Sequence, residues 1–304
     1  VIEPTPVAVP VQEPTPVVTP IQETFHYDPV ASLNSSSILE PIMRLYDLTH
    51  EVRYLKFAKH IVDSGMSYQT NIVAEAIKNK LYPYQFKVRK AYEMMSCFEG
   101  LLEYYRVTHE SKYLKAVINF VDKVLDSDFT IIGSSGVETE FFDHSSLTQT
   151  DARKDVGQET CVTVTLMKLL KKVYLFTGDV KYIAPIEKAI YNALYGAVND
   201  TNQTMKLAHA TVWYDDGTFK YVPHESYEFD SYSPLYMNRR GTGVGGFRTL
   251  QNKRSYGCCA CNGSNGMALP SLLAVTKDDK HLMINLFDTY TTTTKFDDDK
   301  IIII

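Results

Sequence analysis

Three cysteines lie within four residues of one another near the C-terminal end of the chain. They are Cys258, Cys259 and Cys261, and a fourth, Cys161, opens a segment with helical periodicity. Five cysteines in 304 residues is too few, and an odd number, for a full disulfide framework. Such a cluster instead indicates metal or thiol chemistry.

The types and positions of these residues predict a zinc site. Thiolates are stabilised at helix N-termini, and three thiolates with one carboxylate suit tetrahedral zinc. We expect Glu159 and Cys161 on one arm of the site and two of the clustered cysteines on the other. The spacing departs from the C-x2-C pairs of zinc ribbons, so inert buried thiols, or a disulfide from Cys161 to the cluster, are alternatives.

A threefold repeat predicts the scaffold that positions these residues. Thr49, Thr108 and Thr177 each follow an apolar-periodic segment and each precede a tyrosine by five residues. This pattern is typical of one helix ending and another beginning, and it predicts helical hairpins that stack into a solenoid or toroid. The expected helical segments are 36–64, 90–106, 111–127, 159–176 and 180–198.

The two ends of the chain differ from the middle. Residues 1–30 hold two near-copies of a proline-rich decapeptide, which predicts an extended arm or linker. Residues 31–280 are expected to form the helical domain, and residues 281–304, which have strand character, the truncated start of a β-domain. Residues 200–260 are aromatic, glycine-rich and aperiodic, which favours loops or short strands over one rim. A G-x-G-x-x-G match at 241–246 lacks the strand, helix and acid of a dinucleotide site and is expected to be a loop.

Charge and hydropathy exclude several classes of protein. The net charge of −5 argues against a nucleic-acid binder, and no apolar run reaches the length of a membrane span. No basic and apolar leader follows Val1, so the compartment is left unassigned.

The order of three motifs resembles a known enzyme family. The stretch from Gln158 to Lys168 (QETCVTVTLMK), the YNAL beginning at Tyr191, and the YGCC ending at Cys259 are similar to glycoside hydrolase family 127, the β-L-arabinofuranosidases. The resemblance covers about residues 36–290. It implies a mainly α fold, an (α/α)6 toroid followed by β-sandwich modules, and a carbohydrate substrate.

The resemblance also implies roles for individual residues. Glu159, Cys161, Cys258 and Cys259 would hold Zn²⁺, Cys258 would be the nucleophile, and Glu140 would be the general acid/base. A retaining glycosidase needs such a nucleophile and proton donor flanking the scissile bond. Glu138 and Asp143 are competitors for the role of Glu140.

Departures from the family leave a second interpretation open. The chain shows three clear hairpins where the toroid needs about six, and the early half of the barrel and the β-sandwich are missing. Cys261 also allows Cys259 and Cys261 to be the ligands instead. The alternative to a zinc-thiolate glycosidase is a non-catalytic helical-repeat scaffold with a structural cysteine cluster, whose proline-rich arm is a candidate contact for an assembly partner.

Overall fold

The computed structural model describes most of the helical part of the chain and separate pieces of the rest. The described residues are 29–137, 140–151, 158–197, 207–213, 219–224, 232–233, 248–249, 255–256, 258–296 and 300–303. The expectations for the proline-rich arm and for the glycine-rich loop at 241–246 fall outside these residues. Within the described ranges, no helix combines the length and the apolar character needed to cross a bilayer.

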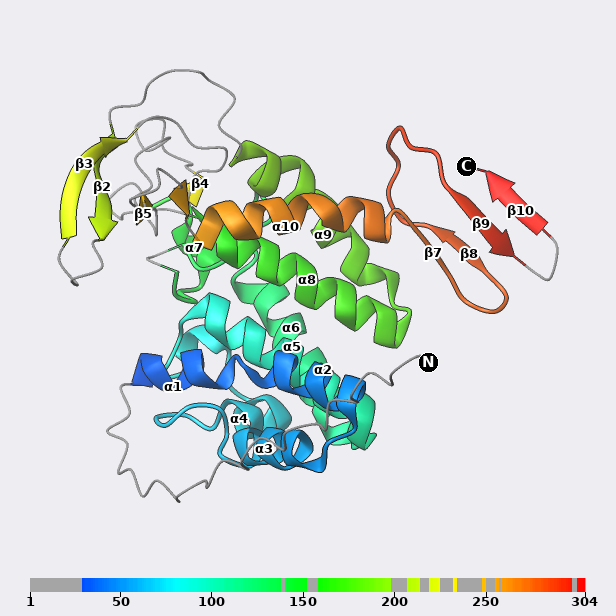
Figure 1. Ribbon diagram of the computed structural model, residues 1–304, viewed down its shortest axis with the longest axis horizontal. Helices are drawn as coiled ribbons and strands as arrows, with labels where there is room; N and C mark the ends of the chain where they lie inside the picture. Colours follow the sequence, from blue (N-terminus) through cyan, green and yellow to red (C-terminus); the bar gives the residue numbers. More distant parts are fainter. Residues whose placement is uncertain are drawn as a thin grey trace, which may run out of the picture.

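Four helices run parallel and side by side, and we call them the inner layer (Figure 1). They are α2 (Leu39–Thr49), α5 (Ala91–Thr108), α8 (Thr160–Thr177) and α10 (Cys258–Leu273). Cross-helix contacts show the common direction: Asp47 meets Arg106 near the ends of α2 and α5, and Glu99 meets Lys168 near the middle of α5 and α8. The N-terminal ends of α5, α8 and α10 therefore lie at one rim of the layer.

The remaining helices form an outer layer and its connections. They are α1 (Pro29–Ser36), α3 (Val52–Asp63), α4 (Ile72–Lys78), α6 (Ser111–Ser127), α7 (Ser145–Thr148) and α9 (Ile183–Ala189), with short turns at Pro83–Gln85 (η1), Val180–Tyr182 (η2) and Ile190–Leu194 (η3). Helices α3, α6 and α9 each return beside the inner helix that precedes them. The core lies between the layers, where Phe98 and Phe120 stack with ring centroids 3.9 Å apart.

The threefold repeat forms the same turn in each hairpin. In the second hairpin the hydroxyl of Thr108 donates to the carbonyl of Tyr104 and accepts from the amide of Glu110, and His109 takes the left-handed conformation at φ 56°. Thr49 and Thr177 make the equivalent bonds. The helical segment expected at 36–64 therefore resolves into two antiparallel helices separated at His50.

A close approach fixes the packing of α2 on α5. A Cβ added at Gly100 would lie 2.7 Å from the Cβ of Leu39 and 2.8 Å from the backbone nitrogen of Glu40. Because any side chain at Gly100 would push α2 away, glycine lets Glu40 come near the charged residues of α5 and α8.

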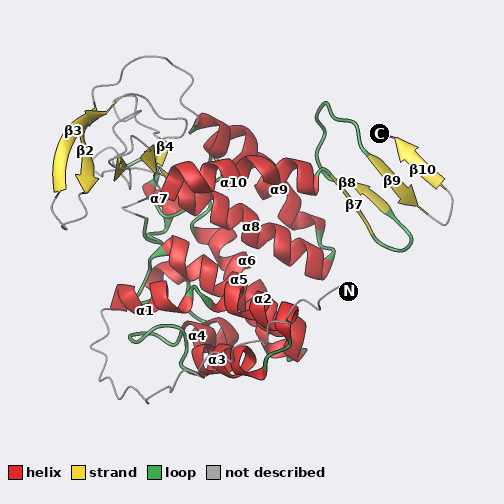
Figure 2. Cartoon of the chain, viewed as in Figure 1, coloured by secondary structure: helices red, strands yellow, loops and turns green. Residues whose placement is uncertain are grey.

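Strands occur at two ends of the helical body (Figure 2). One four-stranded sheet has the order β3-β2-β5-β6, and the pair β1-β4 lies near the start of α8; the C-terminal hairpins are β7-β8 and β9-β10. The strands are β1 (Gln158–Glu159), β2 (Leu207–Trp213), β3 (Phe219–His224), β4 (Tyr232–Ser233), β5 (Arg248–Thr249), β6 (Ser255–Tyr256), β7 (Val275–Lys277), β8 (Leu282–Ile284), β9 (Thr293–Phe296) and β10 (Lys300–Ile303). A mainly helical, toroid-like fold with strands beginning at the C-terminus confirms the fold class expected from the sequence.

Candidate metal centre

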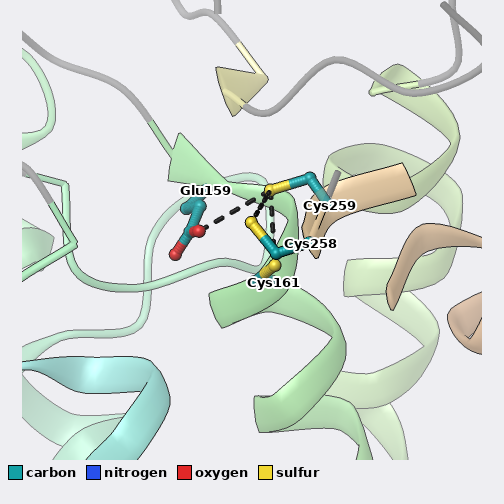
Figure 3. Close-up of side chains that lie close together, drawn as sticks. All are labelled: Glu159, Cys161, Cys258 and Cys259. Atoms are coloured by element: carbon teal, nitrogen blue, oxygen red, sulfur yellow. Dashed lines mark hydrogen bonds between the residues drawn. The ribbon is translucent and has the colours of Figure 1, made fainter. Parts of the chain in front are cut away.

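The expected metal ligands meet at the shared rim of α8 and α10. Glu159 is the residue before α8, Cys161 is the second residue of that helix, and Cys258 and Cys259 begin α10. Their ligand atoms all lie within 4.8 Å of one another (Figure 3). Residues about 100 positions apart in the chain come together because two parallel neighbouring helices start at the same level.

The distances within the group suit a tetrahedral ion. The sulfur of Cys259 lies 3.3 Å from that of Cys161, 3.9 Å from that of Cys258 and 3.6 Å from Oε1 of Glu159. Thiolates bound about 2.3 Å from a tetrahedral zinc lie about 3.8 Å apart. Neither the three thiols nor the one carboxylate needs a large movement to bind a common ion.

A buried oxygen supplies a second test of the fit. Oε2 of Glu159 is buried and has no hydrogen-bond partner in the described part of the chain. Burial, followed by the nearby charges of Glu140 and Cys258, raises the pKa of Glu159 well above its ordinary value. A buried carboxylate in such surroundings is stabilised by a cation, so the group could hold a metal ion.

The four residues differ in exposure and in acidity. Glu159, Cys161 and Cys259 are buried, whereas Cys258 is exposed. Hydrogen bonds from the thiols of Cys161 and Cys259 lower the pKa of Cys258 to about 3. The pKa of Cys161 is raised, chiefly by its hydrogen bonds to Cys258 and Cys259. The exposed cysteine of the group is therefore the one whose pKa is lowered.

Cys261, the alternative ligand, is not part of the group. Its thiol is exposed, on α10 one turn beyond Cys258. Cys97 lies in the buried core of α5, where burial raises its pKa, and its thiol donates to the carbonyl of Leu33. The structure thus brings Cys258 and Cys259 together with Glu159 and Cys161.

Glu140 lies close to the metal group on a loop paired with the start of α5. Its carboxylate forms an ion pair with Lys90, and its charge is near enough to affect the pKa of Glu159. The amide of Ala91 donates to the carbonyl of Glu140 at 2.8 Å, and Glu140 itself has a left-handed φ of 69°. Such strain in a non-glycine residue persists only where surrounding contacts impose it.

Buried Asp128 imposes the shape of this loop. Its Oδ1 accepts the backbone amides of Asp143, His144 and Ser145 at 3.0, 2.9 and 3.1 Å. Both carboxylate oxygens of Asp143 accept hydroxyl hydrogen bonds, at 2.6 Å from Ser145 and at 2.7 Å from the hydroxyl of Thr148. Asp143 therefore anchors the loop, and Glu138, the other competitor for the acid, lies outside the described residues.

Three further residues lie near the centre, and two of them, Tyr92 and Glu93, were missed from the sequence. The side chain of Asn262 donates to the sulfur of Cys161 at 3.2 Å and also bonds to Tyr92. Glu93 has a raised pKa, first through burial and then through the like charges of Glu140 and Cys258. Tyr92 and Glu93 lie in the first turn of α5, directly after Lys90, and this position was the signal that the sequence offered.

Comparisons with known proteins identify a matching family. The family model described as β-L-arabinofuranosidase, GH127 catalytic domain, matches residues 22–211. That range holds Glu140, Glu159 and Cys161, while Cys258 and Cys259 lie beyond it. No curated protein sequence matches the chain.

Three solved structures share the fold. A glycoside hydrolase matches with a TM-score of 0.54 at 17% identity, covering 89% of this chain and 43% of its own. A GH127 β-arabinofuranosidase matches with a TM-score of 0.53 at 20% identity, covering 86% of this chain and 36% of its own. A GH127 β-L-arabinofuranosidase from Geobacillus stearothermophilus T6 matches with a TM-score of 0.52 at 16% identity, covering 86% of this chain and 41% of its own. The chain thus spans about two fifths of the length of the structures it matches.

Proposed function

Since the chain belongs to the GH127 β-L-arabinofuranosidase catalytic-domain family, we propose that it acts as a retaining glycosidase of that type with Zn²⁺ as its cofactor. The observation that carries this proposal is the unequal exposure of the metal group. Three of its members are buried and Cys258 is exposed. A structural zinc site is usually closed on all sides, whereas a catalytic one offers a reactive group to substrate.

Glu159, Cys161, Cys258 and Cys259 are the residues that would hold zinc. When bound, zinc keeps cysteine sulfur deprotonated at neutral pH. The buried thiols of Cys161 and Cys259 donate to the exposed Cys258, so they lower its pKa even in the protein alone. Cys258 is then a thiolate placed at the N-terminus of α10, where the helix dipole also favours negative charge.

In this proposal Cys258 is the nucleophile. Its sulfur attacks the anomeric carbon of a furanoside while the bond to the leaving oxygen breaks, which forms a glycosyl thioether on Cys258. Water then attacks the same carbon and releases the sugar with retained configuration.

Glu140 gives the proton to the leaving oxygen and later takes one from water. Glu159 is unsuited to this role because it is buried against the thiols. A retaining mechanism places the nucleophile and the acid about 5–6 Å apart. The ion pair with Lys90 and the loop anchored by Asp128 hold Glu140 at the rim where such a separation is possible.

The division of the chain follows the same proposal. Residues 31–280 are the catalytic-type domain, residues 1–30 a linker, and residues 281–304 the beginning of a β-domain. The structural matches cover most of this chain but only about two fifths of the relatives' own length.

The test measures zinc content together with hydrolysis of an aryl β-L-arabinofuranoside. We expect close to one zinc per chain, and a loss of about 10³-fold or more in kcat for Cys258→Ser and for Glu140→Gln. Glu140→Gln should keep its zinc, and Cys261→Ser should behave as the parent. Mass spectrometry of the Cys258 peptide after reaction with a slow substrate should show the added sugar. Unchanged turnover in Cys258→Ser would disprove the assignment.

The burial of Glu159, Cys161 and Cys259 favours one alternative, a non-catalytic scaffold with a structural zinc. The same measurements separate the two functions. One zinc per chain, no turnover above background in the parent protein, and no sugar on Cys258 would support the scaffold. Turnover that depends on Cys258 would exclude it.

A further inference from the structure

A second candidate site lies on the inner layer, far along the helices from the metal group. A cavity of about 500 Å³ opens between α2, α5, α8 and α10, along α2 and the C-terminal halves of the other three helices. Figure 1 shows α2, α8 and α10 crossing the same face of the molecule. A cavity of this size accommodates a small organic molecule.

The carboxylates on the walls of this cavity are all paired. Glu40 accepts from Lys172 at 2.5 Å and from Arg44 at 2.9 Å. Glu103 pairs with Arg106 at 3.0 Å and with Lys172 at 3.3 Å.

The other two carboxylates of the network are paired as well. Asp47 lies 3.2 Å from Arg106, and Glu99, behind the wall, lies 3.3 Å from Lys168. Each negative charge is therefore already matched by at least one cation.

The cations outnumber these acids, and the surplus falls on Lys171. Five cationic residues line the cavity: Arg44, Arg106, Lys168, Lys171 and Lys172. Within the described ranges, Lys171 has no carboxylate at ion-pair distance. Burial and the neighbouring charges of Lys172 and Arg44 lower its pKa, so like charges crowd this wall.

The helix dipole does not balance that surplus. Its influence is confined to about the last turn of a helix. Lys171 stands six residues before Thr177, the end of α8, and so outside that turn. Lys171 thus lines the cavity without a carboxylate at ion-pair distance in the part of the chain that the structure describes.

Part of the cavity lining is apolar. It includes Phe176 of α8 and Leu269 and Leu272 of α10, and Leu272 is 59% exposed. A ligand that fits both parts of the lining carries an anionic group and an apolar group.

We propose that this cavity binds a small molecule bearing a carboxylate or phosphate on an apolar group, with the anion held by Lys171 and Arg44. The planar guanidinium of Arg44 and the ammonium of Lys171 both donate to oxyanions. The apolar part lies against Phe176 and Leu269. This site is independent of the metal group and of any glycosidase activity.

Calorimetric titration of the full chain at low salt tests the proposal with four probes. They are 3-phenylpropionate, phenyl phosphate, inorganic phosphate and the neutral 3-phenylpropanol. We expect one of the two aromatic anions to bind more tightly than inorganic phosphate and at least about tenfold more tightly than the alcohol. If inorganic phosphate binds as tightly as the preferred aromatic anion, the apolar half of the proposal is overturned. If the alcohol binds as tightly, or if neither aromatic anion binds, the whole proposal is overturned.

Variants identify the residue responsible. Lys171→Gln should weaken binding of the preferred anion by about tenfold, while Lys171→Arg should keep it within about threefold. Lys115→Gln on the exposed side of α6 is the matched control for charge and should bind as the parent. Because Lys171→Gln removes repulsion, its melting temperature should equal or exceed that of the parent. Parent-like affinity in folded Lys171→Gln would overturn the assignment.

Discussion

The inner layer carries opposite charges at its two ends. Its N-terminal rim holds the thiols of α8 and α10 and the carboxylates of Glu140 and Glu159. Its C-terminal half holds lysines and arginines that pair with a few buried carboxylates. Among the described residues, acidic groups outnumber cations around the metal group, whereas cations outnumber acids at the cavity.

The parallel direction of the helices explains much of this contrast. The partial positive charge at each N-terminus favours thiolates, and the partial negative charge at each C-terminus favours cations such as Arg106 in the last turn of α5. Because neighbouring helices point the same way, these small effects fall on the same side of the layer. One end is then suited to a metal ion held by anions, and the other to a network of ion pairs.

Loss of a metal ligand should have a larger effect than any other variant at the metal group or at the cavity. Cys161→Ser should lower zinc affinity by more than about 100-fold and lower the melting temperature, because it leaves two thiols and Glu159 to hold the ion. Zinc analysis after dialysis against a weak chelator checks this. Cys261→Ser, the matched control, should retain the metal. If both variants retain it equally, the ligand set is wrong.

The second largest effect should come from replacing Lys172, the central lysine of the ion-pair network at the cavity. Lys172 is 14% exposed and pairs with Glu40, Glu99 and Glu103. Lys172→Met leaves these carboxylates under-compensated, so we expect the free energy of unfolding to fall by about 3 kcal/mol. Urea unfolding measures it. Lys181→Met, at a surface pair with Asp122, should cost less than about 1 kcal/mol. Equal losses would show that the network is no more important than a surface pair.

Glu40 should make the stability of the C-terminal half depend on pH. Burial alone would raise its pKa, but Lys172 and Arg44 outweigh burial and lower it from 4.5 to about 2. The unfolded chain therefore binds the proton first, so the contribution is complete above about pH 4.5 and is lost as the pH falls toward 2. Glu40→Gln should cost about 2–3 kcal/mol at pH 7 and much less near pH 2.5. A difference that does not change with pH would contradict this linkage.

The smallest effect should come from removing the hydrogen bond between the side chain of Asn262 and the sulfur of Cys161. Asn262 donates to the sulfur of Cys161, and removal of such an outer partner costs roughly 10-fold or more in metal affinity. Asn262→Ala should therefore bind zinc about tenfold more weakly, as measured by competition with a chromogenic chelator. Asn265→Ala, one turn further along α10, is the control. Unchanged affinity in Asn262→Ala would show that this bond does not tune the site.

Local signals in the sequence predicted most of the helical body. The threonine turns are formed by bonds within four residues, so Thr108 and the two equivalents marked the hairpins correctly. The motif around Cys161 likewise indicated a helix N-terminus, which α8 confirms at Thr160. Helix α4 was missed because its seven residues are too few to show a clear period.

The sequence by itself determined the residue types available for chemistry: a glutamate and a cysteine at the start of one helix, and a cluster of cysteines at another position. Only the tertiary structure decided that Cys258 and Cys259, and not Cys261, join Glu159 and Cys161. The physical reason is that side-chain direction depends on the packing of α10 against α8, which is close at Gly266, where an added Cβ would lie 2.7 Å from Val164. The pairing of Glu140 with Lys90, and of Glu40 with Lys172, likewise joins residues 50 and 132 positions apart, which no local pattern encodes.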